Sequence, residues 1–170
     1  MAKVWGGKLK CTFHGPRHWE LDKDLWFLSA QAHQYFSEWR ELGVEVTRTI
    51  KREGPPSTKA KVIIRAGYHT DLASIHRLAW SFIAPWDVAR AAIIHDLLYK
   101  RIRQYRAECS KGLKNSEDPK VISDAKKASD DVFHMAMKDA EPSVAWWKIA
   151  AAYYSVKMFG RWSIIPRVED

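Results

Sequence analysis

The sequence predicts an α+β fold, in which a small N-terminal β-sheet packs on a C-terminal bundle of about three helices. Two observations indicate this class. Short segments that alternate polar and apolar residues gather before residue 67, and longer segments with helical periodicity follow residue 74. No internal repeat or low-complexity tract interrupts the chain. The 170 residues therefore suit one domain, 1–170, with a β-rich part over 1–66 and a helical part over 74–160.

The N-terminal part is expected to form four short strands, over 8–14, 19–21, 25–28 and 61–66. Gly15-Pro16 ends the first strand, and Asp22-Lys23-Asp24 forms the turn between the second and the third. A helix over 30–42 and a polar loop over 51–60 separate the third strand from the fourth. The loop contains Gly54-Pro55-Pro56-Ser57, a run that opposes regular structure.

Three long helices are expected in the second part, after a short one over 74–82; they cover 87–106, 121–139 and 143–159. Thr70 or Asp71 is expected to cap the short helix, and Ser123 to cap the second long helix. Pro142 marks the start of the last helix and Gly160 its end. The first long helix is apolar on all sides, so we expect it to be the buried centre of the bundle.

His95 and Asp96 are the only polar residues in the apolar run 91–98 of this central helix. An unpaired charge is costly to bury, so both side chains need partners or line a cavity. Tyr99 lies four residues after His95 and three after Asp96, and its hydroxyl therefore reaches the same region. The His95-Asp96 pair marks the candidate site.

Asp130, in the helix expected over 121–139, is the carboxylate that we expect to orient His95. A carboxylate on one ring nitrogen fixes the tautomer, raises the basicity of the imidazole and leaves the other nitrogen free to take a proton from water. Asp96 would hold a cation or stabilise developing charge. The sequence thus predicts a hydrolase-like site, whose catalytic residues are His95, Asp130 and Tyr99.

The same pair also allows a structural role, in which it locks the N-terminal connection onto the central helix by hydrogen bonds to Thr70, Asp71 or Ser74. In the hydrolase interpretation, Thr70 and Ser74 instead shape the site. Ser74 with His76 lacks the Gly-x-Ser-x-Gly elbow of serine hydrolases, so a serine nucleophile is not expected there.

The chain is basic, with 28 Lys and Arg against 20 Asp and Glu. Residues 100–127 alone contain nine Lys and Arg and four Asp and Glu. Such a surface favours a polyanionic partner, which would be nucleic acid, phospholipid head groups or an acidic protein face; no nucleic-acid motif accompanies the charge. The residues expected to bind this polyanion are Lys100, Arg101, Arg103 and Arg106.

The cysteines and the N-terminus indicate a cellular protein. Cys11 and Cys109 are too few and too far apart for a disulfide framework or a zinc ribbon, which favours a reducing compartment. The first residues lack the apolar run of a signal peptide, and no apolar run reaches membrane-spanning length. We therefore expect a soluble protein that is not exported by a signal peptide.

Four motifs follow one another along the chain: Gly67-Tyr68-His69-Thr70-Asp71-Leu72-Ala73-Ser74-Ile75-His76-Arg77, then the run 91–99, then Asp130-x-x-Phe133, then Tyr153-x-x-Val156-Lys157-x-Phe159-Gly160. In this order they resemble an uncharacterised protein family common in tailed bacteriophages and prophages. The resemblance covers roughly 19–28 and 61–160, leaves 29–60 as an insertion, and departs at His76, where that family usually has proline. It implies a phage protein of the bacterial host cytoplasm or of the virion, without an established activity.

The pattern His95-Asp96-x-x-Tyr99 is also similar to a helix of phospholipase A2 domains. Those domains place an aspartate on a second helix; their histidine activates water and their first aspartate binds calcium. The resemblance implies these roles for His95, Asp130 and Asp96, with calcium as cofactor and an anionic phospholipid membrane surface as partner. Asp71 is the second expected metal ligand. The chain departs from this pattern because it lacks the glycine-rich calcium loop and the disulfides.

Two alternatives stay open. The chain is similar to His…His-Asp…Asp metal phosphohydrolases, in which His69 or His76, His95-Asp96 and Asp130 would be the ligands of a divalent metal; a β-rich N-terminal part does not match their all-helical fold. The other alternative is a virion or assembly component without enzymatic activity, which binds other phage proteins through its apolar and basic surface.

Overall fold

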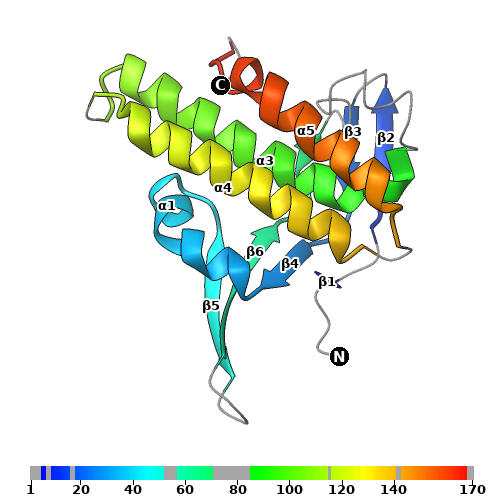
Figure 1. Cartoon of the computed structure of the whole chain (residues 1–170). Helices are drawn as coiled ribbons and strands as arrows, with labels where there is room; N and C mark the ends of the chain where they lie inside the picture. Colours follow the sequence, from blue (N-terminus) through cyan, green and yellow to red (C-terminus); the bar gives the residue numbers. More distant parts are fainter. Residues whose placement is uncertain are drawn as a thin grey trace. The chain divides into compact units, whose positions relative to one another are not determined.

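The structure is a computed structural model that describes residues 5–6, 9–15, 18–51, 57–70, 85–114, 116–140 and 143–167. The chain divides into two compact units, Met1–Asp71 and Leu72–Asp170. Strands and two short helical segments make up the described part of the first unit, and three long helices make up that of the second (Figure 1). The predicted α+β class is confirmed.

The described part of the first unit contains two sheets, whereas we predicted a single one. A four-stranded sheet consists, in spatial order, of β1 (Trp5–Gly6), β4 (Leu25–Ser29), β6 (Ser57–Ile64) and β5 (Val46–Lys51). A three-stranded sheet consists of β2 (Cys11–Gly15), β3 (His18–Leu21) and β7 (His69–Thr70). Every pairing within these two sheets is antiparallel.

The prediction of a loop over 51–60 was wrong, because β5 and β6 form a hairpin there (Figure 1). Their register runs from Val46 opposite Val62 to Lys51 opposite Ser57. Strand β5 is rich in β-branched residues, which favour extended backbone. Strand β6 begins at Ser57 and not at the expected residue 61, because residues 57–60 pair with β5. Residues 52–56 lie outside the described residues.

Alternation along the strands builds the core of the first unit. Leu25 and Phe27 of β4 lie opposite Ile64 and Val62 of β6, and all four side chains are buried. In place of the single helix expected over 30–42, the chain forms the 3₁₀ helix η1 (Gln31–Tyr35) and the short α1 (Phe36–Glu41), which buries Trp39.

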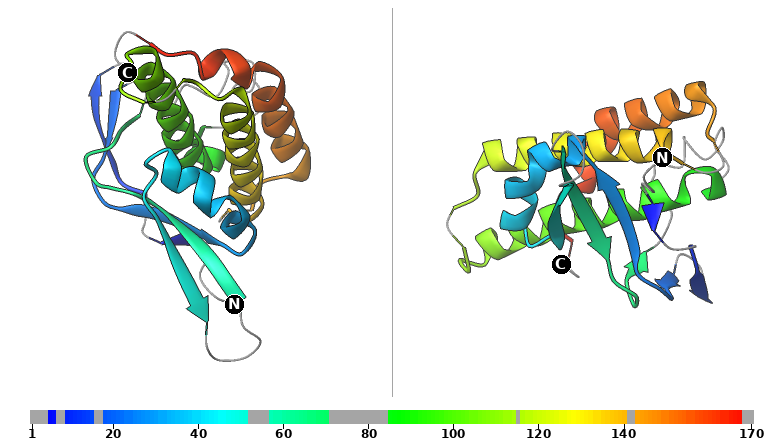
Figure 2. Two further views of the ribbon diagram at one scale, coloured as in Figure 1. Left: turned by 90° about the vertical axis from the view of Figure 1, so that its left-hand side faces the viewer. Right: turned by 90° about the horizontal axis from the view of Figure 1, so that it is seen from below.

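The second unit consists, in its described part, of α3 (Pro85–Ser110), α4 (Pro119–Lys138) and α5 (Trp146–Ser163). The three helices run side by side, and α4 packs against both α3 and α5 (Figures 1 and 2). The α3 side chains buried around the helix include Val88, Ile93, Ile94, Leu97, Leu98 and Ile102, as expected for the central helix. No helix in the described ranges combines the length and apolarity that a bilayer crossing requires.

Two predicted helix ends differ from the observed ones. The N-cap of α4 is Asp118, whose Oδ1 accepts a hydrogen bond of 2.8 Å from the Lys120 amide, and not Ser123, because Pro119 already starts the helix. Gly160 does not stop α5, which continues to Ser163. The short helix expected over 74–82 lies outside the described residues.

Candidate functional site

Asp130 of α4 is the centre of a buried polar cluster in the helical unit. Its Oδ1 accepts hydrogen bonds from the Tyr99 hydroxyl at 2.7 Å and from Nε2 of His95 at 3.1 Å. Its Oδ2 accepts from Nζ of Lys126 at 2.7 Å. The side chains of His95 and Asp130 are only 7% and 5% exposed, so these partners replace water around the carboxylate. The hydrogen bond between His95 and Asp130 joins α3 to α4, although the two residues are 35 positions apart in the sequence.

The electrostatics of the cluster fix which atoms carry hydrogen. Burial raises the pKa of Asp130, but the hydrogen bond and the positive charge of His95, together with the hydrogen bonds from Lys126 and Tyr99, outweigh burial, so the pKa lies below its ordinary value. Burial and the Asp130 charge raise the pKa of Tyr99, which therefore keeps its proton. Since a carboxylate only accepts, Nε2 of His95 must be the donor, and in the neutral ring Nδ1 holds the free lone pair.

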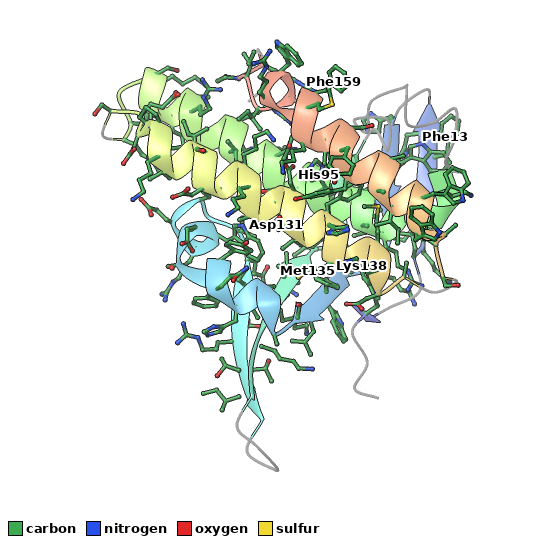
Figure 3. All side chains as sticks on the ribbon, viewed as in Figure 1. Phe13, His95, Asp131, Met135, Lys138 and Phe159 are labelled. Atoms are coloured by element: carbon green, nitrogen blue, oxygen red, sulfur yellow. The ribbon has the colours of Figure 1, made fainter. Side chains whose placement is uncertain are left out.

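The His95 ring is also held by aromatic contacts. Its centroid lies 4.0 Å from that of Tyr99, one turn further along α3, and 4.8 Å from that of Phe133 on α4. Phe133 follows Asp130 by three residues, which places both on the same face of α4. Packing and the Asp130 hydrogen bond together define one orientation of the imidazole. Figure 3 labels His95 on α3 and Asp131, Met135 and Lys138 on α4.

Lys126 belongs to the cluster, although the sequence analysis did not select it. It precedes Asp130 by four residues on α4, and its Nζ also lies 3.5 Å from the carbonyl oxygen of Val156 on α5. The Lys-to-Asp spacing of four was the signal that could have identified it. Through Lys126 the cluster reaches the third helix.

Gly160 brings α5 close to the cluster. A Cβ at this position would overlap the Tyr99 hydroxyl and would lie 3.2 Å from Cε of Lys126. A hydrogen atom in place of a side chain is therefore required for α5 to pack over these two residues. The role of this glycine is close helix approach rather than helix termination.

A second polar contact lies next to the Asp130 cluster on α4. The Tyr153 hydroxyl of α5 donates to Oδ1 of Asp131 at 3.2 Å, and the His134 ring stacks on the Tyr153 ring at 4.5 Å. Asp131 is labelled in Figure 3. Tyr153 belongs to the last of the four sequence motifs, and this contact gives it a place in the packing of α4 against α5.

Only some of the remaining predicted site residues are described by the structure. Asp96 is half-buried on α3 and has an interaction of its own, while Thr70 is buried in β7 of the first unit. Asp71 and Ser74, as well as His76, lie outside the described residues. His69 is exposed in β7, where its Nδ1 lies 3.1 Å from Nε2 of His18.

The donors needed by a bound cation are therefore not assembled in the described part of the chain. Among the described residues, no three His, Cys, Asp or Glu side chains are placed to hold one metal ion. Calcium takes six to eight oxygen ligands, and of the two predicted ligands only Asp96 is described. Because Asp71 lies outside the described residues, calcium binding stays a prediction.

Two of the four predicted polyanion-binding residues contact the carbonyl end of α5. Arg103 is buried and its Nη1 donates to the Ser163 carbonyl at 3.1 Å. Nη1 of Arg106 donates to the Ile164 carbonyl at 3.0 Å, and its Nε donates to Glu117. These guanidinium groups satisfy carbonyls that a helix C-terminus leaves without intrahelical partners. Arg101 donates to Gln104, and Lys100 is half-buried.

The fold and this cluster define an α+β protein whose helical unit is joined by a His-Tyr-Asp-Lys network. The chain belongs to the family described as "Protein of unknown function (DUF1353)", whose model matches residues 44–156. The matched range includes 44–60, which we expected to be part of an insertion, and does not include 19–28. No curated protein and no solved structure matches the chain.

Proposed function

We propose that this chain is a bacteriophage-encoded hydrolase in which His95 activates water for attack on a phospholipid ester. The observation that carries the proposal is the Asp130 carboxylate on Nε2 of His95, with the Tyr99 hydroxyl on the same oxygen atom. The phage origin rests on the order of the four sequence motifs, and the choice of a phospholipid ester rests on the similarity of the His95 helix to phospholipase A2 domains.

The geometry supports a general base. Nδ1 of His95 takes a proton from water, and the water oxygen forms a bond to the ester carbonyl carbon. Collapse of the tetrahedral intermediate breaks the bond between this carbon and the alcohol oxygen, which receives the proton from His95. Asp130 stabilises the imidazolium that forms in between, and Tyr99 holds the carboxylate in place. Calcium binding stays a prediction, and no step is assigned to a metal.

A second candidate function is a structural phage component, and the burial of the cluster favours it. Asp130 accepts from three donors, and the cluster links α3, α4 and the α5 carbonyl of Val156. A buried hydrogen-bond network of this kind specifies helix packing without any chemistry. The two candidates differ in whether the protein turns over a substrate.

Fatty-acid release from vesicles of phosphatidylcholine and phosphatidylglycerol tests the proposal, with calcium added or chelated in separate arms. The informative variant is His95→Gln, because the glutamine amide still donates to Asp130 but does not take a proton. Loss of a general base lowers rates by about 10²–10⁴-fold. The matched control is His134→Gln, which changes a histidine of the same unit that stacks on Tyr153 instead of contacting Asp130.

The proposal predicts that the wild-type chain and His134→Gln release fatty acid and that His95→Gln does not. If the wild-type chain releases none in either arm, or if His95→Gln is as active as the wild type, the hydrolase is excluded. The structural candidate then remains, and the stability measurements described in the Discussion test it.

A further inference from the structure

Helix α5 has two apolar faces, and only one of them is covered. Its buried residues are Ile149, Ala152, Val156 and Gly160. The opposite side exposes five apolar side chains: Trp147 at 46%, Tyr154 at 59%, Met158 at 64%, Trp162 at 51% and Ile165, just after the helix, at 51%. At 100° per residue, their spacings of seven, four, four and three form a single row. We call this row the α5 stripe.

An exposed row of this composition requires an explanation. Single apolar side chains are common on protein surfaces, but contiguous apolar patches mark sites of interaction. The opposite face of α5 already supplies the contact with α4, so the α5 stripe is not needed for packing within the described part of the helical unit. Its two tryptophans and one tyrosine combine a large apolar ring with a polar edge, which suits a boundary between water and an apolar phase.

The charged residues of α5 itself are all positive, and they flank the α5 stripe. The helix contains Lys148, Lys157 and Arg161 and has no Asp or Glu anywhere along its length. The Arg161 guanidinium lies 4.2 Å from the Trp162 ring centroid, and the Lys148 ammonium lies 5.8 Å from that of Trp147. Phe159, labelled in Figure 3, stacks on Trp162 at 5.9 Å and widens the aromatic end of the row.

We propose that the α5 stripe is a docking surface for a bilayer that contains anionic phospholipids. Aromatic rings of an amphipathic helix enter the interfacial region, while Lys and Arg at its edges pair with lipid phosphates. Charge distinguishes this occupant from a second copy of the chain. A symmetric contact through the α5 stripe would bring the cations of two copies together without any carboxylate of α5 to offset them.

The identification of these lipids as substrate rests on the proposed function, whereas the binding itself rests on α5 alone. None of the five stripe residues contributes a side chain to the Asp130 cluster. Membrane binding and ester hydrolysis are therefore measured separately. A wild-type chain that binds vesicles but releases no fatty acid would show that docking holds and the proposed hydrolysis fails.

Cosedimentation of the full chain with vesicles tests the surface, because the nine tryptophans make intrinsic fluorescence ambiguous. One set of vesicles contains phosphatidylcholine alone, and the other contains phosphatidylglycerol in addition. The aromatic variant is Trp147→Ser/Trp162→Ser, and the charge variant is Lys157→Glu/Arg161→Glu. The matched controls are Leu113→Ser, an exposed apolar residue outside α5, and Lys120→Glu/Lys127→Glu, which changes the same charge on exposed positions of α4.

We expect the wild-type chain and both controls to bind the anionic vesicles. Since each cation near such a surface contributes about 1 kcal/mol, equivalent to roughly fivefold in affinity, the charge variant is expected to bind at least about tenfold more weakly. The aromatic variant is expected to lose binding to a similar extent. Circular dichroism checks that these surface variants fold.

Three results would overturn the proposal. The first is a wild-type chain that stays in the supernatant with anionic vesicles. The second is an equal loss of binding in the controls and in the stripe variants, which would assign the effect to charge or hydrophobicity in general. The third is a dimer in solution that the aromatic variant dissociates, which would show that a second copy covers the α5 stripe.

Discussion

Replacing Asp130 by asparagine removes one negative charge from the centre of the helical unit and leaves the shape of the side chain nearly unchanged. In the wild-type chain the carboxylate accepts from His95, Tyr99 and Lys126 while only 5% of its side chain is exposed. The Lys126 side chain, 16% exposed, loses its counterion in the variant. The change therefore leaves a mostly buried ammonium group without its counterion.

The expected cost follows from these contacts. Removing one partner of a buried ion pair lowers the free energy of unfolding by about 3–5 kcal/mol. We expect the lower end, about 3 kcal/mol, because water reaches part of Lys126 and the asparagine oxygen still accepts from Tyr99. Against a total of about 5–15 kcal/mol for a typical domain, this loss is large. Replacing Lys126 by methionine in the same chain should recover about 1–3 kcal/mol relative to the sum of the two single changes.

Urea unfolding at neutral pH, followed by circular dichroism, measures these free energies, with an unchanged m-value showing that the variants unfold from the same compact state. Asp124→Asn is the matched control, because Asp124 is exposed on the same helix; we expect a change within about 0.5 kcal/mol. If Asp130→Asn costs less than about 1 kcal/mol, the reasoning is refuted, because the Asp130 cluster then does not hold the helices together.

Three further predictions concern the same unit. Because the pKa of Asp130 is lowered in the folded chain, its carboxylate stabilises the fold above the unfolded pKa of about 3.9, and this contribution is lost as the pH falls through the folded pKa. In urea titrations at acid pH, the free energy of unfolding of Asp130→Asn should therefore fall less steeply with decreasing pH than that of the wild type. An equal slope of this free energy against pH would contradict the assignment. Gly160→Ala should lower the free energy of unfolding by about 1–3 kcal/mol, since the new Cβ overlaps the Tyr99 hydroxyl; equal unfolding midpoints would show that α5 shifts freely. Arg103→Met should cost about 1.5–3 kcal/mol and speed hydrogen exchange in the last turn of α5, where Arg103 donates to Ser163; unchanged exchange there would rule out a capping role.

Helical periodicity was enough to predict the central helix and the meeting of Tyr99, His95 and Asp130. A spacing of four residues places Tyr99 and His95 next to each other on one face of α3, independently of the tertiary contacts of this helix. Asp130 is the one carboxylate among the buried residues of α4, where Ala128, Val132 and Phe133 are also buried. A buried carboxylate needs partners, and the facing polar residues supply them.

The parts that sequence reasoning missed depend on contacts between elements. Arg103 and Arg106 were assigned to a polyanion surface because the sequence reports their charge, but not that the end of α5 lies beside them. Gly160 is an ordinary helix terminator by local rules, and only the approach of α5 to Tyr99 explains it. Strand β5 was missed because no element was predicted over 43–50, between the helix expected over 30–42 and the loop expected over 51–60. The β-branched residues of Val46–Lys51 were the available signal.

The central claim, that His95 activates water, is tested most directly by the rate of fatty-acid release by His95→Gln relative to the wild-type chain on anionic vesicles. The comparison is valid when both proteins have the same urea midpoint, since the glutamine keeps a donor for Asp130. We predict measurable release by the wild-type chain and a rate lower by about 10²-fold or more in the variant. Equal rates, or no release by the wild-type chain, would contradict the claim.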